Sequence, residues 1–392
     1  MSFDVKEMQR DLRGAGVDGW LLCDFRGRDP IALRLLKLPP GMRTRRWFYF
    51  VPAKGAPRKL VHKIETAALA SVPGTTAYYA GQQELQANLK KLLGGAKHVA
   101  MQYSPGNQIP YVAMVDAGTV ELVRACGAKV VSSADLVQKY EACWTAAQLA
   151  THRAAGVAID RIVAAAFKLA ADAVRAGKGI TEYELQQFIR AEFAAAGIVA
   201  DDGPDVAVNA NASDPHYGPN AGNCAPIRAG DFLLLDVWGK TKDAASVYYD
   251  ITWVGYLGAT VPEKFAKVFR VVRDARDQAV ELIQSRIAAR KPLAGWEVDK
   301  AARDVIEKAG YGKYFTHRTG HNIGEAIHGN GANMDNLETH DTRRLIPRTC
   351  TSVEPGIYLR DFGIRSEVDV YIGEREAEVT GVVQREVLAL LA

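Results

Sequence analysis

The sequence contains few cysteines, and none of them form a pair at metal-binding or redox spacing. Five cysteines are scattered through 392 residues without a Cys-x-x-Cys motif. A disulfide framework needs an even set of cysteines, and a thiolate zinc site needs paired thiolates. We expect neither. The pattern favours a reducing compartment, which predicts a cytoplasmic location.

Long apolar runs are also missing. No run approaches the roughly 18 apolar residues that a membrane-spanning helix requires. Charged side chains occupy positions 4, 6, 7, 10, 11 and 13, where a signal peptide would need an uninterrupted apolar segment. We therefore expect neither a membrane partner nor a signal peptide.

A strong net charge is a third absence. The 49 basic and 45 acidic residues leave a formal charge of +4 and are mostly interspersed, which argues against a nucleic-acid partner. The one basic cluster, residues 43–46, precedes an aromatic run. We interpret it as a solvated edge or an interface patch rather than a ligand site.

The length of the chain predicts two domains, because one hydrophobic core rarely supports so many residues. Residues 1–140 alternate short strands with helices, as an α/β domain would, and contain no cluster of chemically active residues. Residues 141–392 have an α+β pattern. The expected strands are 19–23, 47–51, 59–63, 98–101, 129–131, 206–209, 232–237, 247–254, 350–354, 363–372 and 376–383. The expected helices are 5–15, 84–93, 145–176, 181–196, 262–289 and 296–309.

Three of the eight histidines, His317, His321 and His328, lie within twelve residues. On an uninterrupted helix their spacing would place them on one face. Gly320 and Gly324 instead favour a strand or loop whose backbone can run close to a bulky or charged group. Such a cluster also occurs on polar surfaces without a function, so its meaning depends on carboxylates elsewhere.

Two aspartates, Asp236 and Asp250, interrupt strongly apolar predicted strands. A buried carboxylate is costly unless it is paired or binds a metal, although either residue alone could be a strand-end aspartate or a buried hydrogen-bond acceptor. Across the connection 239–246 the two fit opposed positions on a hairpin. Two neighbouring anions favour a cation between them.

Two glutamates, Glu354 and Glu367, lie in further predicted strands. Strand alternation places Arg365, Glu367 and Asp369 on one face. Taken alone, Arg365 and Glu367 would be a cross-strand ion pair on a wet face. Four strand-borne carboxylates and one histidine together suit two divalent ions that share bridging carboxylates, with manganese, cobalt, iron and zinc all compatible. The acids lack the spacing of a calcium loop.

The order of these residues resembles the pita-bread metallopeptidases, a family that includes methionine aminopeptidase, aminopeptidase P and Xaa-Pro dipeptidase (prolidase). The residues that carry the resemblance are Asp236, Asp250, His321, Glu354 and Glu367, with His216 upstream and His328 downstream. It covers residues 145–392. It implies a pita-bread (creatinase/aminopeptidase) domain at 141–392, with a curved antiparallel sheet flanked by helices. Residues 1–140 resemble the smaller α/β creatinase-type N-terminal domain.

The resemblance also implies a role for each residue. The metal ligands would be Asp236 on one ion, His321 and Glu354 on the other, and Asp250 and Glu367 as bridges. A hydroxide held between the ions would attack the scissile carbonyl, and Glu354 would pass its proton to the leaving nitrogen.

Further catalytic candidates are His216 and His328, which would contact substrate and steady the oxyanion. His317 and Arg365 match the proline-specific branch, where Arg365 would clamp a proline carboxylate or support Glu367. Thr252 resembles a threonine of the family that supports the ligands.

The resulting hypothesis is a dinuclear-metal hydrolase that cleaves Xaa-Pro bonds in dipeptides or short peptides. Mn²⁺ is favoured, although Co²⁺, Zn²⁺ or Fe²⁺ would also fit, and a homodimer is expected because relatives build part of the pocket from a partner subunit. A dipeptidase is favoured over an aminopeptidase P-type exopeptidase acting on longer peptides. A metal-free creatinase-like hydrolase and a non-catalytic pita-bread binding protein would share the fold, but such relatives lose ligands that are all present here.

Three features depart from the family pattern. The connection between Asp236 and Asp250 is a few residues longer than in most relatives, and Asn322 stands where glycine is commoner. Residues 333–344, rich in polar side chains, are expected to form an exposed loop near the site that tunes specificity.

Overall fold

The computed structural model describes residues 4–392, which form two compact units. The first unit ends at Glu141, and the second is Ala142–Ala392. No helix in the described part of the chain is both long and apolar enough to cross a membrane.

The described part of the first unit is built on one mixed six-stranded sheet in the order β4-β3-β2-β1-β5-β6. Its strands are β1 Gly19–Asp24, β2 Trp47–Pro52, β3 Arg58–His62, β4 Thr75–Tyr79, β5 His98–Met101 and β6 Lys129–Ser132. Its α-helices are α1 Val5–Gly14, α2 Pro30–Leu35, α3 Gln82–Leu93, α4 Ala117–Ala125 and α5 Ala134–Glu141. Short 3₁₀ turns occur at Pro105–Asn107 and Pro110–Val112.

Both faces of this sheet are covered. Trp20 and Leu22 of β1 pack in one apolar cluster, and Leu21 and Cys23 pack in another. Successive side chains of a strand point to opposite faces, so helices on both sides explain why the strand is apolar throughout. The α/β layout predicted for this part of the sequence is confirmed.

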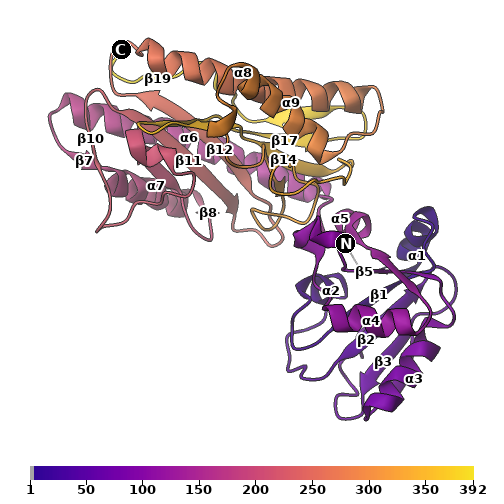
Figure 1. Ribbon diagram of the computed structural model, residues 1–392. Helices are drawn as coiled ribbons and strands as arrows, with labels where there is room; N and C mark the ends of the chain where they lie inside the picture. Colours follow the sequence, from indigo (N-terminus) through magenta and orange to yellow (C-terminus); the bar gives the residue numbers. More distant parts are fainter. Residues whose placement is uncertain (1–3) are drawn as a thin grey trace. The chain divides into compact units, whose positions relative to one another are not determined.

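The second unit contains four long helices and two main sheets (Figure 1). The helices are α6 Ala146–Arg175, α7 Glu182–Ala196, α8 Glu263–Ala288 and α9 Gly295–Lys308. One sheet has the order β19-β12-β11-β8, with β9 also paired to β11, and the other has the order β13-β14-β17-β18. Two short pairs, β7-β10 and β15-β16, complete the described sheets.

The strands of this unit range from two to ten residues. Those of the first sheet are β8 Ile198–Val199, β9 Asp205–Val208, β11 Phe232–Thr241, β12 Tyr249–Tyr256 and β19 Leu388–Ala389. Those of the second are β13 Asn322–Ile323, β14 Thr349–Val353, β17 Val368–Ile372 and β18 Ala377–Thr380. The short pairs are β7 Ile180–Thr181 with β10 Pro226–Ile227 and β15 Gly356–Tyr358 with β16 Gly363–Arg365, and 3₁₀ turns lie at Asn209–Ser213 and Gly312–Tyr314.

Helices cover both faces of the first sheet, as Figure 1 shows for α6 and α7 on one side and α8 and α9 on the other. Phe232 and Leu234 of β11 pack in the cluster that contains α8 and α9, whereas Leu233 and Leu235 pack in the cluster that contains α6 and α7. Asp236 continues the alternation of Phe232 and Leu234. It therefore projects to the face that α8, α9 and the second sheet enclose.

Local signals in the sequence set the ends of the long helices. The side chains of Thr145 and Thr181 each accept the backbone N–H of the residue three positions on. The side chains of Gln148 and Glu184 in turn accept the backbone N–H of Thr145 and Thr181, which completes two capping boxes. The helices predicted at 145–176 and 181–196 are confirmed. One predicted strand, 363–372, is wrong as a single element, because it is broken between β16 and β17.

Candidate metal centre

The two strand aspartates lie on one face of the β11-β12 hairpin. Asp236 pairs with Thr252, and Trp238 pairs with Asp250. The prediction that the aspartates oppose each other directly is therefore wrong by one two-residue step. They still share a face, because alternate residues of a strand and their cross-strand partners point the same way.

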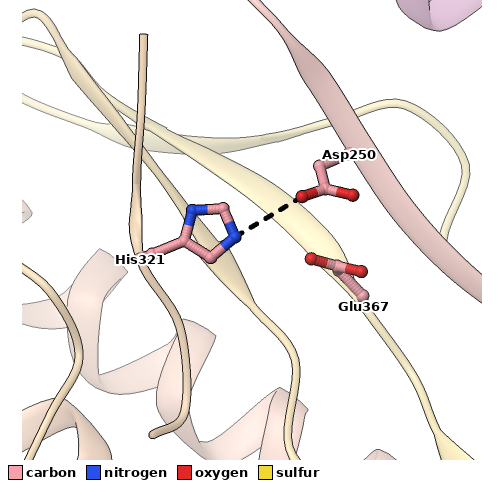
Figure 2. Close-up of side chains that lie close together, drawn as sticks. All are labelled: Asp250, His321 and Glu367. Atoms are coloured by element: carbon pink, nitrogen blue, oxygen red, sulfur yellow. Dashed lines mark ion pairs between the residues drawn. The ribbon is translucent and has the colours of Figure 1, made fainter. Parts of the chain in front are cut away.

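Three buried side chains from distant parts of the sequence converge next to this hairpin. Asp250, His321 and Glu367 each offer one ligand atom within 4.8 Å of the other two (Figure 2). The Nε2 atom of His321 lies 3.5 Å from Asp250 Oδ2 and 3.6 Å from Glu354 Oε1. Four of the five predicted ligands thus meet directly, and Asp236 reaches the same group through Thr252.

The backbone of β14 holds His321 in place. The His321 N–H donates to Ser352 Oγ at 3.0 Å, and its carbonyl accepts the Ser352 N–H at 2.9 Å. A Cβ on Gly320 would lie 2.0 Å from the Ser352 carbonyl oxygen. The predicted strand-or-loop conformation is confirmed, and the neighbour that requires glycine is a strand backbone.

Glu367 lies in the break between β16 and β17. Its N–H donates to the Thr252 carbonyl at 3.3 Å, and its Oε2 is 2.7 Å from Thr252 Oγ1, which is itself 3.2 Å from Asp236 Oδ1. From α8, the buried Arg276 donates to Ser366 Oγ at 2.6 Å and anchors the break. If β16 and β17 formed one continuous strand, Ser366 and Glu367 would follow the regular alternation of a strand, and the hydrogen bond from Arg276 to Ser366 would be lost.

Arg365 is buried and contacts Asp236 rather than Glu367. One of its Nη atoms pairs with Asp236 Oδ2, its Nε donates to Thr252 Oγ1 at 3.0 Å, and its other Nη donates to Tyr358 OH at 3.1 Å. With Arg365 only 4% exposed and Glu367 only 2% exposed, the interpretation as an ion pair on a wet face is wrong.

The electrostatics of the cluster favour an added cation. Burial, reinforced by the charges of neighbouring carboxylates, raises the pKa of Asp250 and of Glu367 well above the usual range. Burial also raises the pKa of Glu354 to about 7, although Arg365 opposes the rise. Asp250 Oδ1 is buried without a hydrogen-bond partner. Hard oxygen donors together with one imidazole fit divalent metal ions, which would satisfy these carboxylates.

The remaining predicted residues surround the cluster. His317 Nε2 lies 2.6 Å from Tyr358 OH, and burial lowers the pKa of His317 to about 3. The His328 ring packs edge-on against the His321 ring at a centroid distance of 4.3 Å. His216 is exposed on the loop after the 3₁₀ turn Asn209–Ser213, and within residues 4–392 its imidazole has no hydrogen bond.

The segment 333–344 is only partly the exposed loop that its composition predicted. Positions 336–338, 340, 342 and 344 are exposed, whereas Asn333, Asp335, Asp341 and Arg343 are all at most 2% exposed. Asp341 accepts the Asn333 N–H at 2.9 Å, and Asn333 Oδ1 accepts the Asn322 N–H at 3.0 Å. The buried polar side chains therefore support the histidine segment from inside the protein.

Two acidic residues at the site were missed. Asp369 Oδ2 accepts the Asp250 N–H at 2.8 Å, and Asp205 of β9 pairs in register with Asp236. Asp369 interrupts an apolar strand segment, as Asp236 and Asp250 do, so the same signal could have found it, whereas Asp205 begins its strand and carries no such signal.

Comparison with known proteins agrees with this geometry. Residues 150–374 match the model of metallopeptidase family M24. The chain belongs to metallopeptidase family M24. An Xaa-Pro dipeptidase of Lactobacillus helveticus is 33% identical over 205 residues, which are 52% of this chain and 50% of that protein. A putative Xaa-Pro aminopeptidase of Mycoplasma pneumoniae is 30% identical over 225 residues, 56% of this chain and 59% of that protein. The chain thus spans about half the length of these curated relatives.

Solved structures share the fold over nearly the whole chain. Dipeptidase PepE from Mycobacterium ulcerans superposes with a TM-score of 0.70 at 23% identity and covers 98% of this chain and 96% of that one. A prolidase from Thermococcus sibiricus gives a TM-score of 0.63 at 20% identity, with 98% of each chain covered. The pita-bread fold expected from the resemblance is confirmed.

Proposed function

We propose that this M24 chain is a metal-dependent hydrolase that cleaves the bond before proline in dipeptides or short peptides. The observation that carries the proposal is the buried convergence of Asp250, His321 and Glu367, with Glu354 beside them. Buried carboxylates without enough cationic charge are unfavourable in a folded protein unless a cation binds them.

The proposed ligands are Asp236, Asp250, His321, Glu354 and Glu367, and they would hold two divalent cations, with Mn²⁺ favoured. One M24 relative in the solved structures, from Caenorhabditis elegans, is described as having a dinuclear active site. When bound, such ions supply an activated water and a Lewis acid for the scissile carbonyl.

The chain's own residues would move the protons and orient the substrate. Glu354, whose Oε1 lies 3.6 Å from His321 Nε2, would take a proton from the activated water and pass it to the leaving nitrogen. His328, packed against His321, and the exposed His216 would donate hydrogen bonds to the substrate carbonyl. His317 stays neutral and orients Tyr358 beside Arg365.

The proline specificity rests on the named relatives, which include dipeptidases and aminopeptidases. A dipeptidase remains favoured, and a homodimer in the cytoplasm remains a prediction. Because Arg365 is committed to Asp236 in this structure, positioning of that aspartate is the role its contacts support best.

Hydrolysis of Ala-Pro and of a longer Xaa-Pro-Xaa peptide, both with added Mn²⁺, tests the proposal. Asp250→Ala serves as the blank. Cleavage of the dipeptide alone supports the dipeptidase, and cleavage of the longer peptide alone moves the assignment to an aminopeptidase. If the wild type cleaves neither above the blank, the proposed function is wrong.

A further inference from the structure

Asp205 extends the row of polar residues at the candidate site by one strand. In register, Asp205 of β9 pairs with Asp236 of β11, and Asp236 pairs with Thr252 of β12. Directly paired residues of an antiparallel sheet share a face, with their Cβ atoms about 5 Å apart. Asp205 therefore faces the same space as the proposed metal ligands, on the side away from Glu367.

The negative charges of Asp236 and Asp205 are not equally balanced by neighbouring positive charge. Asp236 contacts the guanidinium of Arg365. Within residues 4–392, Asp205 has no ion pair and accepts no hydrogen bond on its side chain, and it is partly buried. Like charges directly opposite each other destabilise a sheet, and a cation beside Asp205 would relieve that repulsion.

Asp205 is partly exposed. Gly218, two residues after His216, presents no side chain to it, since a Cβ on Gly218 would contact Asp205 Oδ1 at 3.4 Å. Asp205 lies one strand beyond Asp236, which itself reaches the ligand cluster only through Thr252. A role in holding metal is thus not what its position supports.

We infer that Asp205 is a specificity-determining residue that binds an ammonium group on the substrate residue preceding the scissile bond. The inference rests on the proposed function. With the scissile carbonyl at the ligand cluster, one strand spacing of about 4.8 Å from Asp236 to Asp205 corresponds to little more than one residue of extended chain. That reach covers the α-amino group of the N-terminal residue and a basic side chain on the same residue.

Steady-state hydrolysis of Lys-Pro and norleucine-Pro separates these two sources, because the two side chains differ mainly in the terminal ammonium. The variants are Asp205→Asn, which removes the charge at similar size, and Asp205→Glu, which restores it. Asp274→Asn is the matched control, since it removes an exposed aspartate of α8. Metal content is measured for every variant.

If the side-chain ammonium is bound, the wild type prefers Lys-Pro about tenfold or more in kcat/KM, and Asp205→Asn abolishes the preference. If the α-ammonium is bound, Asp205→Asn lowers kcat/KM about tenfold for both dipeptides, mostly through KM. In either case metal content is unchanged, Asp205→Glu recovers part of the loss, and Asp274→Asn behaves as wild type.

An Asp205→Asn variant within twofold of wild type on both dipeptides overturns the inference while the proposed function stands. Loss of bound metal in that variant also overturns it. A wild type that cleaves neither dipeptide above the Asp250→Ala blank overturns both. Should Asp205→Asn fail to fold, the comparison of wild type with Asp205→Glu on the same dipeptides decides, because a longer anion must shift the Lys-Pro to norleucine-Pro ratio or the KM of both.

Discussion

The carboxylate of Asp369 accepts the backbone N–H of Asp250 at 2.8 Å, and both residues are buried. This bond joins β17 of one sheet to β12 of the other at the point where the ligand cluster forms. The second oxygen of Asp369 has no partner in the described residues. Asp369 thus fixes the backbone of a proposed metal ligand.

Truncating Asp369 therefore weakens the metal centre through Asp250. Asp369→Ala leaves the buried Asp250 N–H without an acceptor, which costs about 1–3 kcal/mol in unfolding free energy. We also expect roughly a tenfold or larger loss of Mn²⁺ affinity, as for other residues that orient metal ligands. Asp369→Asn keeps an acceptor oxygen and should lose much less. Urea unfolding in chelator and calorimetric metal titration check this, and equal losses for the two variants would contradict it.

Metal removal and removal of a ligand carboxylate should have opposite effects on stability. Burial and neighbouring carboxylates raise the pKa of Asp250, so a carboxyl at this position is unfavourable without metal, and Asp250→Asn should unfold at the same or a higher temperature than wild type in chelator at neutral pH. With Mn²⁺ at about 100 times its dissociation constant, wild type should gain about 2.7 kcal/mol and the variant should gain little. Thermal unfolding with and without Mn²⁺ measures both effects. If Mn²⁺ raised the unfolding temperature equally in the two proteins, the assignment of Asp250 as a metal ligand would be wrong.

The close approach of Gly320 to β14 predicts a local packing defect on substitution. In Gly320→Ala the new Cβ would overlap the Ser352 carbonyl oxygen, which belongs to backbone and cannot rotate away. We expect a loss of about 2 kcal/mol or more in unfolding free energy, together with weaker metal binding, because the adjacent His321 must shift. Gly179→Ala, where a Cβ meets nothing within 4 Å, is the control and should differ little from wild type.

The helices and strands of this protein could be predicted from the sequence better than the breaks and connections between them. Apolar periodicity located the strands and helices, because that signal acts within a few residues, and the structure shows capping boxes at Thr145 and Thr181 where two of the helices begin. The carboxylates that interrupt apolar strands located the ligand cluster, because a buried charge is unfavourable unless a distant residue or a bound cation compensates it. The break at Glu367 depends on Arg276 of α8, a partner ninety positions from Ser366, and no local pattern carries that information.

Composition misled where polar residues turned inward. Residues 333–344 were expected to be exposed because they are polar, but only part of the segment is, since Asp341 and Asn333 accept backbone N–H groups and are buried. The register of the β11-β12 hairpin was also predicted wrongly, by two residues. It is set by pairing along the whole of β11 and β12, and the spacing of Asp236 and Asp250 alone does not define it.

His152 predicts an acid-sensitive step in stability. Its side chain is fully buried, with Nδ1 at 2.6 Å from the Tyr248 carbonyl and Nε2 at 2.6 Å from Thr380 Oγ1, and burial lowers its pKa from 6.5 to about 4. Between pH 6.5 and about 4 the His152 imidazole is therefore protonated in the unfolded chain and neutral in the folded protein. Stability is therefore full above pH 6.5 and falls as the pH drops toward 4, by up to about 3 kcal/mol.

Comparison with a His152→Gln variant separates this contribution from that of the titrating carboxylates, of which Asp369 lies 3.9 Å from His152 Nε2. Unfolding free energies in chelator at several pH values from 4 to 8 provide the measurement, and chelator keeps metal release out of the result. The variant should be less stable than wild type at pH 8, since packing and two hydrogen bonds are disturbed. Its deficit should shrink as the pH falls through 6.5 and on toward 4. A deficit that stays constant over this range would mean that His152 accepts its proton in the folded protein as readily as in the unfolded chain.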